Sequence, residues 1–213
     1  MSRSAWAVLA GLVTLVMVAL SGCSAPEQQQ GPVVVSGEVD DGWAGTRLED
    51  PYQVPDVSLT DTSEQSYNLR TSPSTPVTLV FFGYTNCPDV CITVMSDLAM
   101  TLKRSDPGIR DKVTVLFITT DPARDDPEAI RDWLDRFDPS FVGLTGELAR
   151  IKSIATDFGV PIEGMKKLPS GGYEVGHGTQ VIAVTDHQGV MIWTPSTPIG
   201  DLKADLARLV SEQ

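Results

Sequence analysis

Two cysteines, Cys87 and Cys91, follow an apolar run at residues 78–82 and the turn-like sequence Gly-Tyr-Thr-Asn. A buried strand that delivers thiols to the start of a helix is an arrangement of redox and soft-metal sites, because the positive end of a helix stabilises thiolates. Residues i and i+4 of a helical turn face the same way, so the two sulfurs are expected to converge. This spacing suits one soft cation and also permits a disulfide.

The elements that must position these thiols are readable from apolar periodicity. Continuous apolar runs predict buried strands at 76–82 and 113–119, and a proline-containing strand at 54–60 is expected to pair with 67–69 near a sheet edge. The other expected elements are helices at 90–104, 127–137, 147–158 and 199–210, a short strand at 141–144, an exposed loop at 160–173, and a hairpin of 181–184 with 190–193. Strands alternating with helices predict an α/β fold with a central mixed sheet flanked by helices, an N-terminal strand extension and a β-hairpin near the C-terminus.

A thiol pair at the end of a central strand makes this α/β pattern resemble a thioredoxin-like fold. In that topology, the loop before the hairpin packs against the cysteine turn, and thioredoxins usually place a cis-proline there. This chain has no proline between Pro169 and Pro195 and instead carries His177 in that loop. Imidazole together with thiolates suits copper or zinc. The alternative is a loop histidine bonded to backbone; the other histidine, His187, lies in a turn and is expected to be solvated.

The first 22 residues have the composition of an export signal. Arg3 precedes an apolar run that is short for a membrane span, and Leu-Ser-Gly-Cys at 20–23 resembles a bacterial lipobox. This predicts a lipoprotein signal peptide at 1–22, a lipid on Cys23, a flexible anchored linker at 23–50, and a thioredoxin-like domain at 51–213. The expected location is the outer face of the bacterial cytoplasmic membrane. An uncleaved anchor helix is the alternative.

Composition narrows the classes of partner. The 213 residues are 41% hydrophobic and carry a formal charge of −12, so the chain can bury a core and its acidity disfavours nucleic acid. With Cys23 lipidated, Cys87 and Cys91 are the only other thiols of an exported protein. A disulfide closing so short a loop adds little stability, so a functional pair is favoured over a structural one.

The cysteine block, Phe-Gly-Tyr-Thr-Asn-Cys-Pro-Asp-Val-Cys at 82–91, resembles the signature of the Sco/SenC family of copper-handling thioredoxin-fold proteins. Residues 120–128 resemble its Asp-Pro-x-Arg-Asp-x-Pro-Glu block, and 143–146 its Gly-Leu-Thr-Gly turn. The resemblance spans about residues 52–211. It implies Cys87, Cys91 and His177 as copper ligands, in a protein serving assembly of the dinuclear copper centre of cytochrome c oxidase.

Three residues depart from the family pattern. Ile92 replaces the proline after the second cysteine, Gly176 the aspartate beside the histidine, and Gly178 a serine. Loss of that aspartate removes a carboxylate that would orient the histidine, which lowers the expected metal affinity. Asp121, at the end of a predicted strand, is a substitute candidate for this supporting role; its alternative is to cap the turn before Pro122.

These observations predict a membrane-tethered copper chaperone that binds Cu(I) or Cu(II) and passes it to the copper-site subunit of the oxidase or to another copper chaperone. The second hypothesis is a thiol–disulfide oxidoreductase that reduces cysteines of a copper-site partner through a redox-active Cys87–Cys91 disulfide, without needing His177. A peroxidase is disfavoured, because the Pro-x-x-x-Thr-x-x-Cys pattern of peroxiredoxins is missing.

Overall fold

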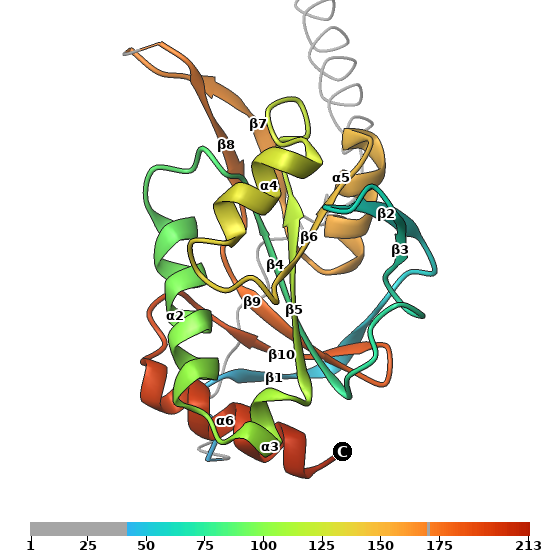
Figure 1. Cartoon of the computed structure of the whole chain (residues 1–213), viewed down its shortest axis with the longest axis vertical. Helices are drawn as coiled ribbons and strands as arrows, with labels where there is room; N and C mark the ends of the chain where they lie inside the picture. Colours follow the sequence, from blue (N-terminus) through green and yellow to red (C-terminus); the bar gives the residue numbers. More distant parts are fainter. Residues whose placement is uncertain (1–41, 170) are drawn as a thin grey trace, which may run out of the picture. The chain divides into compact units, whose positions relative to one another are not determined.

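The computed structural model describes residues 42–169 and 171–213. The expected signal peptide and Cys23 therefore lie outside the described residues. The described residues belong to one compact unit, in which helices pack on a mixed sheet (Figure 1). Among the helices of the described part, none is long and apolar enough to cross a lipid bilayer.

The central sheet has eight strands in the order β1-β10-β9-β4-β5-β6-β2-β3. Strands β4, β5 and β6 are parallel, and the outer neighbours pair antiparallel. The strands are β1 (Thr46–Gln53), β2 (Ser58–Asp61), β3 (Ser66–Asn68), β4 (Val77–Gly83), β5 (Val113–Thr119), β6 (Val142–Thr145), β9 (Val181–Thr185) and β10 (Gln188–Trp193). The predicted α/β, thioredoxin-like fold with a mixed sheet is confirmed.

Helices cover both faces of the sheet because the central strands are apolar on both sides. The helices are α2 (Val90–Arg104), the single turn α3 (Pro107–Arg110), α4 (Pro127–Leu134), α5 (Leu148–Asp157) and α6 (Ile199–Ser211). Leu79 and Phe81 of β4 pack with α2, α4 and α6, whereas Val80 and Phe82 pack with α5. Alternating side chains of a strand point to opposite faces, so β4 is buried throughout and its end is firmly placed.

Two expectations about local structure are wrong. Residues 160–173 were expected to form an exposed loop, but β7 (Ile162–Lys167) and β8 (Tyr173–His177) form a separate antiparallel hairpin that projects from the body (Figure 1). The polar residues of β7 gave no apolar alternation, since this hairpin is exposed along much of its length. The turn between β9 and β10 is also shorter than expected, because Asp186 and His187 both adopt positive φ, as a two-residue type I′ turn requires.

The expected start of the folded domain at residue 51 falls inside β1. This strand pairs with β10, and the segment just before it is held by Asp205 of α6. The buried carboxylate of Asp205 accepts hydrogen bonds from the backbone N–H groups of Ala44 and Gly45 and from Nε1 of Trp193, the last two at 2.8 Å. One side chain thus fixes the entry of the chain into the sheet.

Asp205→Ala is expected to lower the free energy of unfolding by about 2–3 kcal/mol, because the buried N–H groups that Asp205 accepts from lose their acceptor. Urea unfolding followed by circular dichroism measures this loss. Asp201→Ala is the control: it lies in the first turn of the same helix, is exposed, and is expected to cost only about 0.5 kcal/mol. Equal losses in the two variants would contradict the role given to Asp205.

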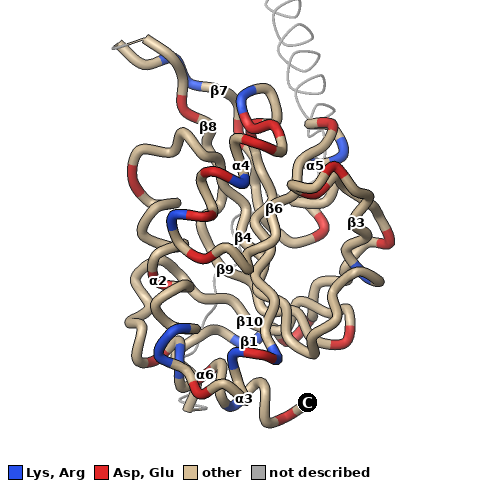
Figure 2. Tube along the Cα trace, viewed as in Figure 1, with Lys and Arg blue, Asp and Glu red and all other residues tan. Residues whose placement is uncertain are grey.

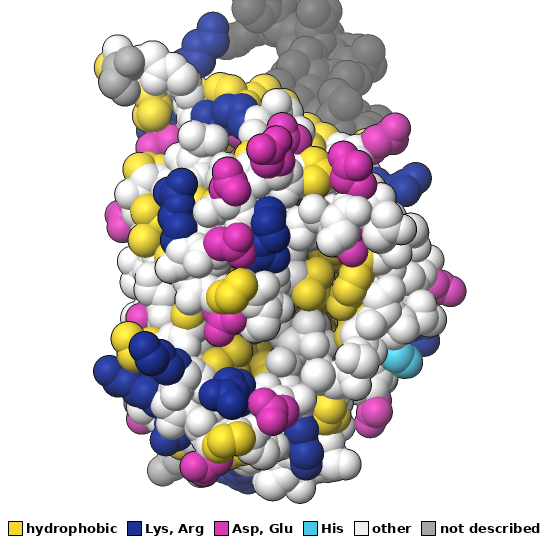
Figure 3. Space-filling model, in the orientation of Figure 1, with side chains coloured by type: hydrophobic (Ala, Val, Ile, Leu, Met, Phe, Trp, Pro, Cys, Tyr) yellow, Lys and Arg dark blue, Asp and Glu magenta, His cyan; other side chains and the backbone are white. Residues whose placement is uncertain are grey.

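Charges of both signs are distributed over the domain. Figure 2 shows acidic residues spread over α4, α5 and β3, with basic residues gathered around α3 and α6. Figure 3 shows the same mixture on the surface, together with hydrophobic side chains at the end of the projecting hairpin. Met165 of β7 is the most exposed large hydrophobic residue described, at 66%.

Candidate metal centre

Both cysteines lie at the end of β4, as expected, but only Cys91 is within the helix. Cys87 and Pro88 belong to the turn that precedes α2, and the N–H of Cys87 donates to the carbonyl of Tyr84. The side chains are buried, with 6% exposure for Cys87 and none for Cys91, and they are free thiols. Gly83 is required beside them: a Cβ there would stand 3.1 Å from Cys91 Sγ and 2.9 Å from the Phe81 ring.

The two thiols differ in protonation. The pKa of Cys87 is held far below its ordinary value, chiefly because the Cys91 side chain hydrogen-bonds its thiolate, with further help from backbone N–H groups of the turn. The pKa of Cys91 is raised by the same interaction and by burial. The pair is therefore one thiolate at Cys87 and one thiol at Cys91. A thiolate is the form that attacks disulfides and binds metals.

His177, the last residue of β8, faces this pair. Its Nε2 lies 3.8 Å from Cys91 Sγ, and its Nδ1 lies 2.8 Å from the carbonyl oxygen of Gly178. A carbonyl only accepts hydrogen bonds, so Nδ1 carries the proton and Nε2 presents its lone pair to the sulfurs. The rings of Tyr84 and Phe81 stand edge-on to the imidazole, with centroids 5.8 and 6.4 Å away. The expected approach of this histidine to the thiols is therefore present.

The donor set fits a soft cation. The 3.8 Å between nitrogen and sulfur is close to the roughly 3.7 Å expected for two ligands of one ion at an angle near 120°. Over residues 42–169 and 171–213, however, no three His, Cys, Asp or Glu side chains already form a complete ligand set. Holding one ion with Cys87, Cys91 and His177 together would require small side-chain adjustments at the turn or at β8.

The profile of the SCO1/SenC family matches residues 46–211. The chain belongs to the SCO1/SenC family.

Solved and curated relatives agree with this membership. Apo Sco1 of Thermus thermophilus is 32% identical with a TM-score of 0.70, over 78% of this chain and 96% of that one. ScoI of Bradyrhizobium japonicum, solved with copper bound, is 28% identical with a TM-score of 0.61, over 75% and 98%. Protein sco1 of Schizosaccharomyces pombe is 39% identical over 82 residues, 38% of this chain and 31% of its own length. The matches span from 31% to 63% of the first four curated relatives.

The departure of this Sco chain at Gly176 has a structural reason. Alternate residues of a strand face opposite sides, so residue 176 faces away from the side that carries His177. A Cβ at Gly176 would stand 2.8 Å from Oε2 of Glu163 on β7. An aspartate here would therefore be pressed against another carboxylate. At Gly178, a Cβ would meet Oε1 of Gln180 at 2.6 Å, so glycine also suits the close packing after β8.

Asp121 does not orient His177 directly. Its carboxylate accepts a hydrogen bond of 2.9 Å from the hydroxyl of Tyr173 and forms an ion pair with Arg124. Tyr173 begins β8, four residues before the histidine. The contact of Asp121 is therefore with the strand that carries His177.

Sequence reasoning missed Asp125, which holds the cysteine turn in place. It is fully buried and accepts hydrogen bonds from the N–H and Oγ1 of Thr85 and from Oγ1 of Thr119, at 2.6–3.0 Å. Burial raises its pKa against the opposing effect of these donors. The residue lies in the acidic block at 120–128, but nothing in the sequence distinguishes it as the buried member of that block. It connects the end of β5 to the turn that carries Cys87.

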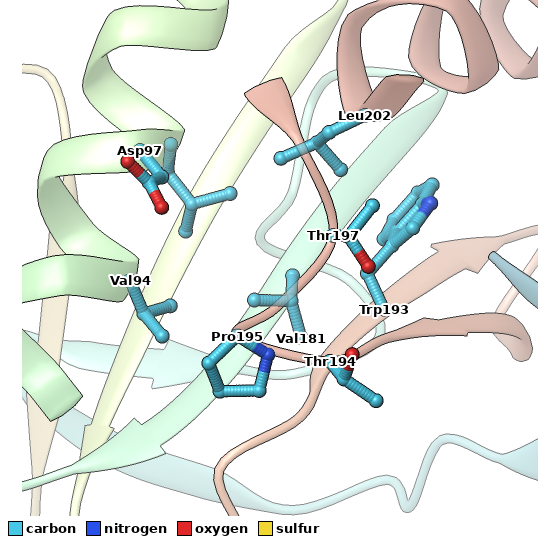
Figure 4. A pocket seen from close by; sticks show the side chains of 9 residues that line it. Val94, Asp97, Val181, Trp193, Thr194, Pro195, Thr197 and Leu202 are labelled. Atoms are coloured by element: carbon cyan, nitrogen blue, oxygen red, sulfur yellow. The ribbon is translucent and has the colours of Figure 1, made fainter. Parts of the chain in front are cut away.

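The other sequence candidate, His187, lies in the turn between β9 and β10 and is exposed. A small cavity of about 20 Å³ opens elsewhere, between α2 and the segment after β10 (Figure 4). It has room for about one water molecule.

Alkylation of Cys87 in the reduced, metal-free protein is expected to keep nearly the same rate between pH 8 and pH 6. Its pKa lies well below this range, whereas a thiol of ordinary pKa would slow on the order of 100-fold. Iodoacetamide labelling with peptide mass mapping measures the rate. In Cys91→Ala the principal donor to the thiolate is removed, so a stronger pH dependence is expected. A wild-type rate that falls like that of an ordinary thiol would disprove the thiolate assignment.

Proposed function

We propose that this protein is a membrane-tethered copper chaperone for the dinuclear copper centre of cytochrome c oxidase. It binds one copper ion through Cys87, Cys91 and His177. The observation that carries this proposal is the imidazole Nε2, 3.8 Å from Cys91 Sγ, with its other nitrogen bonded to the Gly178 carbonyl. The copper-bound relative from Bradyrhizobium japonicum, 28% identical, supports the choice of metal.

Each ligand has its own part. The Cys87 thiolate is ready to capture the ion, and Cys91 releases its proton to solvent as its sulfur binds. Two thiolates satisfy soft Cu(I), whereas the imidazole is needed to retain Cu(II). Delivery is ligand exchange, in which sulfur or imidazole groups of the partner replace these ligands one at a time. The partner is the copper-site subunit of the oxidase or another copper chaperone.

The proposed location is the outer face of the bacterial cytoplasmic membrane, with a lipid on Cys23. The support is the Leu-Ser-Gly-Cys sequence after a short apolar run. Cys23→Ser is expected to prevent lipid labelling and to release the protein from the membrane fraction. Lipid labelling that persists in this variant would disprove the anchor.

Copper titration of the reduced full chain in detergent tests the ligand set. His177→Ala is expected to weaken Cu(II) binding by more than ~100-fold, beyond the range for residues that only support a ligand, and to change Cu(I) binding much less. The control is His187→Ala, which removes the other histidine of the chain. Unchanged copper binding in His177→Ala combined with Cys87→Ser would overturn the proposal.

The alternative function is thiol–disulfide exchange with a copper-site partner, and the thiolate–thiol pair favours it. In that reaction Cys87 attacks a partner disulfide, and Cys91 then resolves the mixed disulfide, leaving the partner reduced and Cys87–Cys91 oxidised. Turnover of a disulfide substrate by metal-free protein, with His177→Ala as active as the wild type, would favour this function over the chaperone.

A further inference from the structure

Strand β8 approaches the thiols with one of its two faces. Tyr173, Val175 and His177 alternate along the strand, so their side chains share a face. Val175 is buried in the same core cluster as both cysteines. The hairpin is otherwise a separate two-stranded sheet that projects from the domain (Figure 1). The placement of His177 therefore depends on what ties this face of β8 to the domain.

One tie is at the start of β8. Arg124 lies over the ring of Tyr173, with its guanidinium carbon 3.7 Å from the ring centroid, and its Nη2 donates to the Tyr173 carbonyl. Its Nε forms the ion pair with Asp121, whose other oxygen accepts the Tyr173 hydroxyl. Ring, carbonyl and hydroxyl of one residue are thus held by a single arginine–aspartate pair. We call Arg124, Asp121 and Tyr173 the latch.

The latch is continuous with the cysteine turn. The guanidinium carbon of Arg124 is 5.7 Å from the ring centroid of Tyr84. The Tyr84 ring is edge-on to His177, with centroids 5.8 Å apart. Asp121 follows β5 after one residue, and its backbone N–H donates to Oγ1 of Thr119 at the end of the strand. These contacts join β8 to the fixed ends of the central strands.

We propose that Arg124, acting through Asp121 and Tyr173, is a positioning residue that holds His177 against the thiols and so determines how well the protein retains Cu(II). This rests on the proposed function for the identity of the ion. Two thiolates suffice for Cu(I), so the latch affects the ion whose binding requires the imidazole. The planar guanidinium matters here, because it stacks on the ring while it donates along its edge.

The test uses the reduced full chain, with Arg124→Gln and, as the milder change, Tyr173→Phe. Arg124→Gln is expected to weaken Cu(II) binding by ~10-fold or more, with Cu(I) binding changed by less than ~3-fold. Arg124→Lys is expected to be intermediate, since it keeps the charge beside Asp121 and loses the planar stack. In metal-free protein, the ring-nitrogen NMR signals of His177 are expected to broaden or shift in Arg124→Gln.

Arg131→Gln is the matched control. Arg131 has almost the same side-chain exposure as Arg124, 28% against 27%. Like Arg124, it forms an ion pair with an aspartate, Asp135, and donates a hydrogen bond to a backbone carbonyl, that of Phe141. It lies on α4 and makes these contacts away from β8. Cu(II) affinity and the His177 signals are expected to match the wild type in this variant.

Two results would overturn the latch. One is Arg124→Gln with wild-type Cu(II) affinity and unchanged His177 ring signals. The other is an equal loss in Arg124→Gln and Arg131→Gln, which would indicate a general effect on stability. Failure of the proposed function can be distinguished from failure of the latch, because in that case His177→Ala binds Cu(II) like the wild type. In that case the His177 signals of the metal-free protein still decide whether Arg124 positions the ring. If Arg124→Gln does not fold, the Cu(II) affinity and the His177 ring signals are measured in Tyr173→Phe instead, and the same two outcomes decide.

Discussion

Cys91→Ser is expected to weaken Cu(I) binding by more than ~100-fold, which exceeds the loss for residues that only support a ligand. The substitution keeps the shape of a fully buried side chain and replaces a soft sulfur with a hard oxygen. Its effect is therefore on the metal more than on packing. Competition with a chromogenic Cu(I) chelator, using the reduced full chain in detergent, measures the affinity.

Met100→Ser is the control for Cys91→Ser. It also replaces a sulfur-containing residue of α2 by serine, but at an exposed position about two and a half turns further along the helix. Wild-type Cu(I) affinity is expected in this variant. If Cys91→Ser bound Cu(I) within a few-fold of the wild type, the two-thiolate site would be wrong.

Asp125→Ala is expected to reduce the free energy of unfolding by about 3 kcal/mol or more. Its buried carboxylate accepts hydrogen bonds from three donors of Thr85 and Thr119. Each buried donor left without an acceptor costs about 1–3 kcal/mol. The turn that carries Cys87 is released at the same time, so faster alkylation of Cys91, normally inaccessible, is expected as well. Urea unfolding and thiol labelling measure the two effects.

Asp126→Ala is the control for Asp125→Ala. This neighbouring aspartate caps α4 by accepting one hydrogen bond from the N–H of Ala129, on the exposed side of the chain. A loss of about 1 kcal/mol is expected from the missing cap, with no change in thiol labelling. The assignment of Asp125 fails if the two variants lose the same stability and Cys91 remains protected in both.

The orientation of His177 depends on different residues from those that the family pattern points to. The family pattern predicts an aspartate beside the histidine that orients the imidazole, and this chain has Gly176 in its place. The strand places that position against Glu163, on the face away from the thiols. Support comes instead from the Gly178 carbonyl at Nδ1, and from Asp121 through Tyr173. Asp121 thus has a place near the site, although its contact is with the strand and not with the imidazole.

The strongly patterned elements could be predicted from the sequence. Apolar β-branched runs at β4 and β5 are buried on both faces, and Asp126-Pro127 fixes the start of α4, where the aspartate cap is present. The hairpin of β7 and β8 could not be predicted, because β7 is exposed along most of its length and only Val175 of β8 is buried, which leaves no apolar alternation to read. The same holds for β1, whose burial pattern is mostly exposed.

The sequence by itself determined which side chains this Sco protein has available for chemistry: two thiols after a buried strand, and one histidine placed before the next central strand. Residue type and order are sufficient for this, since thiolate and imidazole define the ions they bind. Only the tertiary structure decided which thiol carries the proton, which imidazole nitrogen faces it, and which residues hold β8 in place. These depend on distances between segments far apart in the chain, which burial and hydrogen-bond geometry set after the sheet has formed.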